Sequence, residues 1–166
     1  DPVKAMEHAL GKVGLQVLIA ILLVTPLRRF TKLNFLSWRR ALGVIAFFYI
    51  LLHFLVWMVL DVQILSQVKA DLIKRPYIIV GMVSLLILLP LAITSNNLSI
   101  RKLGPRWRKL HKATYLAVAL GGVHYIMQTK GFEYEPYIYL ALVIGLIAMR
   151  KLPKKRAAPP ANRQAA

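Results

Sequence analysis

Apolar residues in this chain are gathered into long runs and do not alternate regularly with polar ones. Read along the sequence, the runs cover residues 9–27, 41–60, 77–94, 113–127 and 136–149. A helix needs roughly 20 apolar residues, with about 17 as a lower limit, to cross the hydrocarbon core of a bilayer. The second and third runs reach this length, the first reaches it with Lys12 or its flanks, and the last two need their basic and aromatic flanks. The pattern predicts an all-α fold, a polytopic transmembrane helical bundle of five helices.

The composition supports a membrane protein and excludes several kinds of site. The chain has 166 residues, of which 58% are hydrophobic, and its mean hydropathy is +0.57, which is too apolar for an ordinary soluble domain. It contains no cysteine, which excludes disulfides, thiolate metal sites, cysteine-ligated iron–sulfur clusters and covalently attached c-type haem. It starts at Asp1 without a methionine or a visible leader, so we expect an upstream segment to be missing.

The charged residues between the runs alternate in sign. The net charge of +17 could suggest nucleic acid, but a nucleic-acid binder gathers its charge on one soluble face. Here the basic residues concentrate in 28–40, 101–112 and 150–163, whereas all six acids fall in the other intervening segments. Cytoplasmic loops of membrane proteins carry an excess of lysine and arginine. The three basic segments are therefore predicted to face the cytoplasm, and no nucleic-acid partner is expected.

Two histidines, His53 and His124, lie inside the apolar runs, and a third, His111, lies beside the fourth run. His53 lies thirteen residues after Arg40, which is about 20 Å along a helix axis and places it in the outer half of the bilayer. His124 lies near the outer end of the fourth run, at a similar depth. Ionisable groups at membrane depth are costly and usually mark function. Because two imidazoles on neighbouring helices can hold a haem iron from both sides, His53 and His124 are predicted to be the axial ligands of one b-type haem.

Each of these histidines also has a simpler interpretation. His53 and His124 could be buried residues hydrogen-bonded to a neighbouring helix, and His111 could be solvated at the membrane interface. His8 lies in a polar stub and is expected to be structural only. The thirteen residues from His111 to His124 leave the two side chains about 140° apart on an ideal helix, unless the helix changes phase, for which Gly121–Gly122 is the expected place.

The aromatic and helix-breaking residues give further expectations. Trp57 and Tyr125 adjoin the histidines, where they could form a haem wall or belong to interfacial aromatic belts. The segment 61–76 has apolar residues at helical spacing and is expected to lie along the membrane surface. Pro90 is expected to kink the third helix, and Gly104–Pro105 to form a turn.

The residues in and around the fourth run carry a resemblance to a known family. The stretch R-K-L-G-P-R-W-R-K-L-H-K-A-T-Y-L over 101–116, the later V-H-Y, the earlier L-L-H, the opening D-P-V-K and the R-P-Y at 75–77 resemble MsrQ (YedZ). This is the haem-binding membrane subunit of the periplasmic methionine-sulfoxide reductase system. More distantly, the chain is similar to the ferric reductase and NADPH oxidase transmembrane domain.

The resemblance covers nearly all of residues 1–150, which implies one ferric-reductase-like haem-binding transmembrane domain there. Residues 151–166 are then a basic, disordered cytoplasmic tail. The larger family has six helices and four haem-ligating histidines in two pairs. Here the first helix is expected to be absent, and Arg39 or Arg40 occupies the place of the fourth histidine.

The resemblance also implies a function. Electrons would pass from the quinone pool or a cytosolic flavin reductase, through haem b, to a periplasmic molybdopterin-dependent methionine-sulfoxide reductase. The chain would be an electron-transfer subunit of the bacterial inner membrane with its C-terminus in the cytoplasm. It has no G-x-G-x-x-G or Walker pattern, so no nucleotide-binding domain of its own is expected.

The same resemblance extends the set of candidate cofactor sites. It implies His111 as a further haem ligand, beside His53 and His124, and so a second haem. It implies FMN as another cofactor, for which no residue pattern in the sequence identifies a site. Haem propionates or an FMN phosphate could pair with basic side chains, and the candidates, which are equally explained as cytoplasmic-side charges, are Arg39, Arg40, Arg106 and Arg108.

Two other function classes are compatible with the sequence. One is a free-standing transmembrane ferric or quinone reductase cytochrome, which would use the same haem with another acceptor. The other is a proton-coupled transporter in which histidines relay protons and bind no iron. The transporter is disfavoured because no acid lies within any apolar run.

Overall fold

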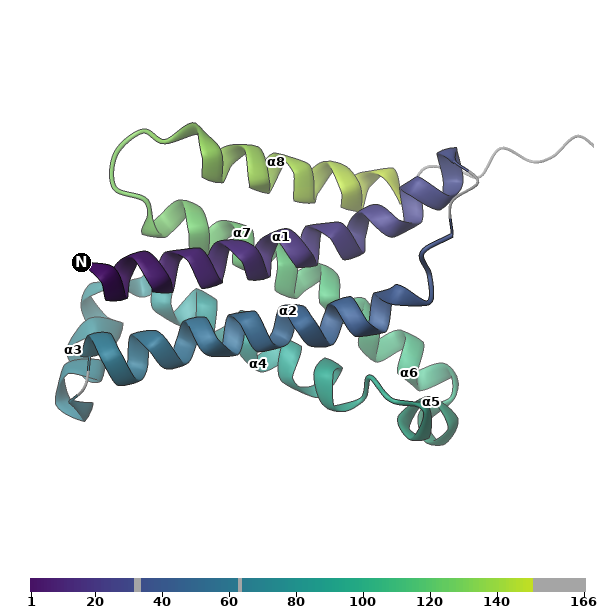
Figure 1. The fold of residues 1–166 in the computed structure, drawn as a ribbon, viewed down its shortest axis with the longest axis horizontal. Helices are drawn as coiled ribbons and strands as arrows, with labels where there is room; N and C mark the ends of the chain where they lie inside the picture. Colours follow the sequence, from purple (N-terminus) through teal and green to yellow (C-terminus); the bar gives the residue numbers. More distant parts are fainter. Residues whose placement is uncertain (32–33, 63, 151–166) are drawn as a thin grey trace, which may run out of the picture.

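Five long helices run back and forth along one axis and form the body of the molecule (Figure 1). The computed structural model describes residues 1–31, 34–62 and 64–150, so the predicted tail at 151–166 lies outside the described residues. The long helices match the five apolar runs and confirm the predicted all-α bundle. Their bounds are Pro2–Phe30 (α1), Trp38–Leu55 (α2), Pro76–Ile93 (α4), Thr114–Gln128 (α7) and Tyr134–Met149 (α8).

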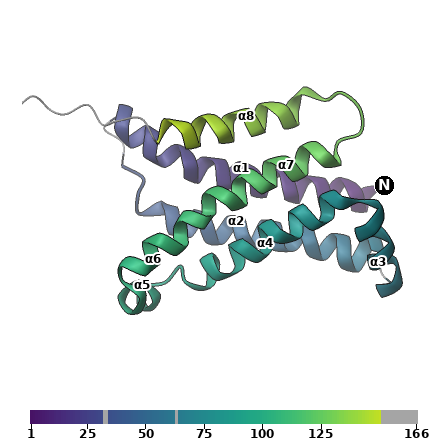
Figure 2. The same cartoon turned by 180° about the vertical axis from the view of Figure 1, so that it is seen from behind.

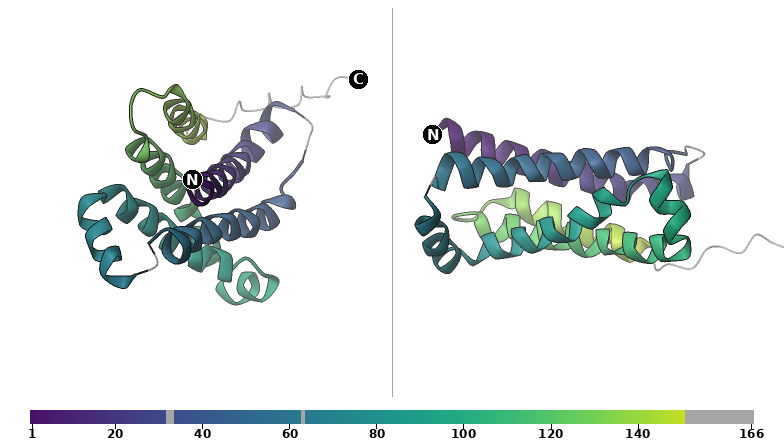
Figure 3. Two further views of the ribbon diagram at one scale, coloured as in Figure 1. Left: turned by 60° about the vertical axis from the view of Figure 1, so that its left-hand side comes forward. Right: turned by 90° about the horizontal axis from the view of Figure 1, so that it is seen from below.

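Shorter elements connect the long helices at the two ends of the bundle (Figure 2). A π-helical segment, Val56–Val62, extends α2, and α3 (Leu65–Lys74) forms a helix within 61–76, whose position along the membrane surface stays a prediction. Together with the N-terminus and the α7–α8 loop, α3 marks what we call the α3 end. The opposite end, which we call the basic end, holds α5 (Asn97–Leu103), α6 (Pro105–Leu110) and the last turn of α8 (Figure 3).

Local chemistry explains where several of these helices begin. The side chain of Asp1 accepts a hydrogen bond from the Val3 N–H at 3.0 Å and caps α1, and Asn96 caps α5 through the Ser99 N–H at 2.8 Å. Gly104 has φ of 50°, which glycine tolerates without a steric cost, and Pro105 then opens α6. The predicted turn is therefore present, but short helices flank it in what the sequence suggested was a loop.

The helices that carry the histidines are more regular than expected in one place and less regular in another. α7 remains α-helical through Gly121 and Gly122, so of the two alternatives the phase change at these glycines does not occur. The departure from α geometry is a 3₁₀ turn at His111–Ala113, where α6 leads into α7. Pro90 lies inside the continuous α4, and the Thr94 hydroxyl donates to the Pro90 carbonyl at 2.6 Å.

Close helix packing builds the core. α1 packs mainly against α2, and α4 against α7, and the side chains of Leu18, Leu22, Val118 and Val143 are almost completely buried between these helices and α8. The hydroxyl of Ser84, on α4, donates to the Ala117 carbonyl on α7 at 2.8 Å and is buried. Small residues and interhelical hydrogen bonds of this kind are typical of helices that pack in lipid.

The outer surface of the bundle is apolar. Phe48, Leu86 and Ile144 expose 55%, 62% and 58% of their surfaces, which is unfavourable in water but neutral against lipid tails. Among the described residues, three helices are long and apolar enough to cross a membrane: Pro2–Phe30, Trp38–Val62 and Pro76–Ile93. α7 and α8 are shorter, at 15 and 16 residues, as their runs predicted. The chain is a multi-pass membrane protein.

Candidate cofactor site between two histidines

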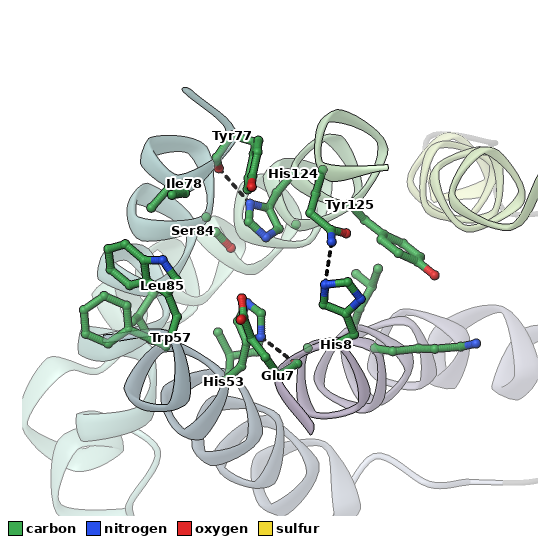
Figure 4. Close-up of a pocket in the computed structure, with 18 of the residues that line it drawn as sticks. Glu7, His8, His53, Trp57, Tyr77, Ile78, Ser84, Leu85, His124 and Tyr125 are labelled. Carbon is green, nitrogen blue, oxygen red and sulfur yellow. Dashed lines mark hydrogen bonds between the residues drawn. The ribbon is translucent and has the colours of Figure 1, made fainter. Parts of the chain in front are cut away.

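A cavity of about 580 Å³ lies between α1, α2, α4 and α7, toward the α3 end (Figure 4). Binding sites for cofactors and small molecules usually enclose about 300–1,000 Å³. Its wall includes apolar side chains such as Ile78 and Leu85, and both Trp57 and Tyr125 line it. The cavity is therefore large enough for a planar cofactor.

His53 and His124 project into this cavity from opposite sides. The two ring centres are 6.1 Å apart, and the ring planes stand at 82° to one another. His53 comes from the outer part of α2 and His124 from the outer part of α7. The structure thus brings together the two histidines that the sequence placed at matched depth.

Each of the two rings is held by a hydrogen bond to a backbone carbonyl of the neighbouring helix, which is α1 for His53 and α4 for His124. Nδ1 of His53 lies 2.8 Å from the Glu7 carbonyl oxygen on α1, and Nδ1 of His124 lies 2.7 Å from the Tyr77 carbonyl oxygen on α4. A carbonyl can only accept, so Nδ1 carries the proton in both rings and Nε2 keeps its lone pair. Metal-ligating histidines have this arrangement, in which the second nitrogen donates to a carbonyl or carboxylate.

The spacing of the rings fits a metal ion held between them. A bond from imidazole nitrogen to a metal is about 2 Å long, and the nitrogen lies about 1 Å from the ring centre, so two ligands in line place their ring centres about 6 Å apart. The observed 6.1 Å agrees. Trp57, which lines the cavity, has a buried indole nitrogen, Nε1, without a hydrogen-bond partner in the described part of the chain. The ring spacing and the two Nδ1–H bonds fit a haem with bis-imidazole ligation.

Charged side chains surround the cavity where it nears the α3 end. The basic residues that line it are Lys4, Lys12, Arg75 and Lys130, and the acidic ones are Glu7, Asp61 and Glu133. Lys12, the only charge inside the first apolar run, forms an ion pair with Glu135 at 2.5 Å. The rim therefore contains several basic side chains that could pair with an anionic group of a cofactor. They are not the four arginines that the sequence suggested for this role.

His8, which the sequence placed in a polar stub away from any site, lies in the cavity wall. It lines the same cavity, and its Nε2 lies 2.7 Å from Nε2 of Gln128. The amide nitrogen of Gln128 is a donor, so His8 Nε2 accepts. This nitrogen is therefore already engaged, whereas the hydrogen bonds of His53 and His124 within the described part of the chain are made by Nδ1.

His111 lies at the basic end and has partners of its own. Its ring stacks on Trp107, with ring centres 3.9 Å apart and planes at 25°, and its Nε2 lies 3.0 Å from the Thr94 hydroxyl. Because that hydroxyl donates to the Pro90 carbonyl, it accepts from His111, whose proton is therefore on Nε2. Burial lowers the pKa of His111. The third predicted ligand is thus separated from the other two and has the opposite tautomer.

The four arginines proposed as anion ligands also lie away from the histidine cavity. Arg39 and Arg40 are at the start of α2, and Arg106 and Arg108 are in α6, and none of them lines the cavity. Arg40 donates to the side-chain oxygen of Asn97 at 2.6 Å. At the same end, burial and the neighbouring charge of Arg39 lower the pKa of Arg150 to about 10.

Comparisons with known proteins agree with this architecture. The model of the ferric reductase like transmembrane component family matches residues 9–122. A Brucella anthropi protein, named protein-methionine-sulfoxide reductase heme-binding subunit MsrQ, is 49% identical over 165 residues, which are 98% of this chain and 75% of the relative. The chain belongs to the MsrQ family. A second MsrQ, from Brucella ovis, is 52% identical over 151 residues, which are 90% of this chain and 69% of the relative. No solved structure matches this MsrQ-family chain.

Two features of the site were not predicted from the sequence. Lys4, Glu7 and Arg75 reach the cavity from segments that the sequence assigned to loops or stubs. Gly11 and Gly81 lie directly against the His53 and His124 rings. A lone glycine inside an apolar helix often has a packing reason, and this is the signal that could have found them.

Proposed function

We propose that this chain is the membrane cytochrome of a methionine-sulfoxide reductase system, with one haem b held between His53 and His124. The observation that carries the proposal is the pair of imidazoles 6.1 Å apart, each with Nδ1 fixed by a carbonyl. The heme-binding function stated in the names of its relatives supports it. Haem b supplies reversible one-electron chemistry when bound.

The residues of the cavity have distinct roles in this proposal. Nε2 of His53 and Nε2 of His124 are the atoms that would hold the haem iron, and ligation by two imidazoles would favour electron transfer over oxygen binding. Ile78 and Leu85 exclude water from the cofactor, which influences its reduction potential. Lys4 and Arg75 are the cations at the rim that would pair with propionate carboxylates.

The proposed direction of electron flow follows from the position of the cavity. It lies toward the α3 end, whose segments carry the acids and are therefore assigned to the periplasm. Electrons leave there for a periplasmic molybdopterin-dependent methionine-sulfoxide reductase. The donor, the quinone pool or a cytosolic flavin reductase, acts at the basic end, where His111 and the four arginines are candidates to hold a second haem or FMN.

The test is a set of histidine variants purified in detergent and compared by absorption spectroscopy. His53→Ala and His124→Ala should each abolish or strongly alter the same low-spin haem component, because each removes one axial nitrogen, and the double variant should look no worse at that component. His8→Ala and His111→Ala should retain it, since neither residue supplies an axial nitrogen to this haem. Protein yield and thermal unfolding exclude misfolding.

The outcomes separate the competing functions. Folded single variants that keep a normal low-spin spectrum would rule out the pairing. A wild-type protein that shows no haem absorption after expression with sufficient haem would favour the histidine-relay transporter. A haem protein that reduces ferric iron or quinone, but not the periplasmic reductase, would be a free-standing cytochrome.

A further inference from the structure

Two glycines stand at equivalent positions behind the two histidines. A Cβ added to Gly11 on α1 would lie 3.0 Å from Nδ1 of His53, and one added to Gly81 on α4 would lie 2.8 Å from Nδ1 of His124. These distances are shorter than an ordinary contact between carbon and nitrogen. Each histidine ring therefore occupies the space that the Cβ atom of any residue other than glycine would need. The two contacts are independent because each glycine touches a different histidine.

Helix geometry explains why the glycine must be at this position. In an α-helix, the Cα–Cβ bond tilts toward the N-terminus, so the side chain of a residue covers the turn before it. Gly11 follows Glu7 by four residues, and Gly81 follows Tyr77 by four. Glu7 and Tyr77 are the residues whose carbonyls accept the histidine hydrogen bonds, at 2.8 and 2.7 Å. The missing side chain is the one that would shield the acceptor.

We propose that Gly11 and Gly81 are positioning residues that fix the tautomer and ring orientation of His53 and His124. By leaving one carbonyl of the neighbouring helix open, each glycine lets Nδ1–H donate to it, although that carbonyl already accepts within its own helix. Nε2 is thereby kept unprotonated and directed into the cavity. The effect of the glycines on haem binding rests on the haem site proposed above. Their effect on the tautomer and orientation of the two rings does not depend on haem.

The chain supplies matched controls for a substitution test. Gly43 on α2 and Gly145 on α8 have nothing within 4 Å of an added Cβ. Gly11→Ala and Gly81→Ala should each lower haem affinity about 10- to 100-fold, the usual effect of losing a partner that orients a metal ligand. Gly43→Ala and Gly145→Ala should bind haem as the wild type does. Altered axial ligation in Gly11→Ala and Gly81→Ala should also change the electron paramagnetic resonance g-values.

A second measurement works without haem and separates this proposal from the proposed function. In haem-free protein with ¹⁵N-labelled histidine, the NMR shifts of His53 and His124, assigned with the two His→Ala variants, should show the Nδ1–H tautomer. Gly11→Ala should change only the His53 signal, and Gly81→Ala only the His124 signal. This result without any haem binding would refute the proposed function and retain the positioning role. Wild-type tautomers and haem affinity in both glycine variants would overturn the positioning role.

A double variant covers the case in which Gly11→Ala does not fold. If the cause is the collision with the His53 ring, Gly11→Ala combined with His53→Ala should fold as well as His53→Ala alone. The same comparison applies to Gly81→Ala with His124→Ala. Failure of the double variants to recover the yield and melting temperature of the single histidine variants would also overturn the proposal.

Discussion

Trp57 lines the histidine cavity and carries a buried hydrogen-bond donor. Its side chain is 6% exposed, and its indole N–H has no acceptor in the described part of the chain. A buried donor without a partner costs about 1–3 kcal/mol. Trp57 follows His53 by four residues, so both face the cavity from the same side of their helix. We therefore expect a bound cofactor to supply the acceptor for this N–H.

Replacement of Trp57 by Phe should affect the haem-bound protein more than the haem-free protein. Without haem, the change removes an unpaired donor and some volume, so the free energy of unfolding should change by no more than about 1 kcal/mol. With haem, loss of a hydrogen bond to a charged acceptor, worth about 1.5–3 kcal/mol, should weaken haem retention roughly 10- to 100-fold. Haem titration and thermal unfolding in detergent measure the two effects. Trp38→Phe, at the exposed start of α2, is the control, and equal haem retention in both variants would contradict the assignment.

At the scale of the elements, glycines determine how closely the helices approach. A Cβ at Gly14 of α1 would lie 2.7 Å from the Cγ1 atom of Ile50 on α2, and Gly14 is buried. A Cβ at Gly122 of α7 would lie 3.0 Å from the Cδ1 atom of Leu140 on α8. Both positions lie beside the core of the bundle, so a Cβ there requires the facing side chain or its helix to shift.

Alanine at Gly14 and alanine at Gly145 should change stability in opposite directions. Gly14→Ala should destabilise the protein by about 1–3 kcal/mol, the usual cost of overpacking a core. Gly145→Ala should stabilise it by up to about 1 kcal/mol, because space is open there and alanine has the higher helix propensity. Thermal unfolding in detergent with haem-free protein measures both. A Gly14→Ala protein as stable as Gly145→Ala would show that α1 and α2 do not pack this closely.

The sequence was informative about elements and depth but not about contacts between helices. Apolar runs and loop charges were sufficient to place the five helices and to put His53 and His124 at one level, because both follow from counting along single helices. The carbonyl partners of those histidines, Gly11 and Gly81 depend on how four helices pack, which no local pattern encodes. The short helices α5 and α6 were missed because their polar residues read as a loop.

At the scale of the whole molecule, the distribution of charge defines two different ends. The basic end carries α5, α6 and the last turn of α8, and the acids of the described residues lie toward the α3 end. The histidine cavity is therefore nearer to the acid-bearing side. The positive-inside rule predicts that this side faces the periplasm, which would bring the cavity close to the proposed electron acceptor.

Reporter fusions should confirm this orientation. An enzyme that is active only in the periplasm should be silent when fused after Ala166, because the C-terminal segment 150–166 is basic and is predicted to be cytoplasmic. The same reporter inserted at Gly131, in the α7–α8 loop, should be active. Strong periplasmic activity from the C-terminal fusion would show that the orientation or the number of membrane crossings is wrong.

The pairing of α1 with α2 and of α4 with α7 gives the site an internal symmetry. α1 runs parallel to α4, and α2 runs parallel to α7 (Figure 1). In each pair, the first helix provides a carbonyl and a glycine, and the second provides a histidine. A half-turn about an axis along the bundle therefore exchanges the two halves of the site. One two-helix hairpin contains everything that half of the site requires, so a homodimer of a single hairpin would be enough to build a complete bis-imidazole site.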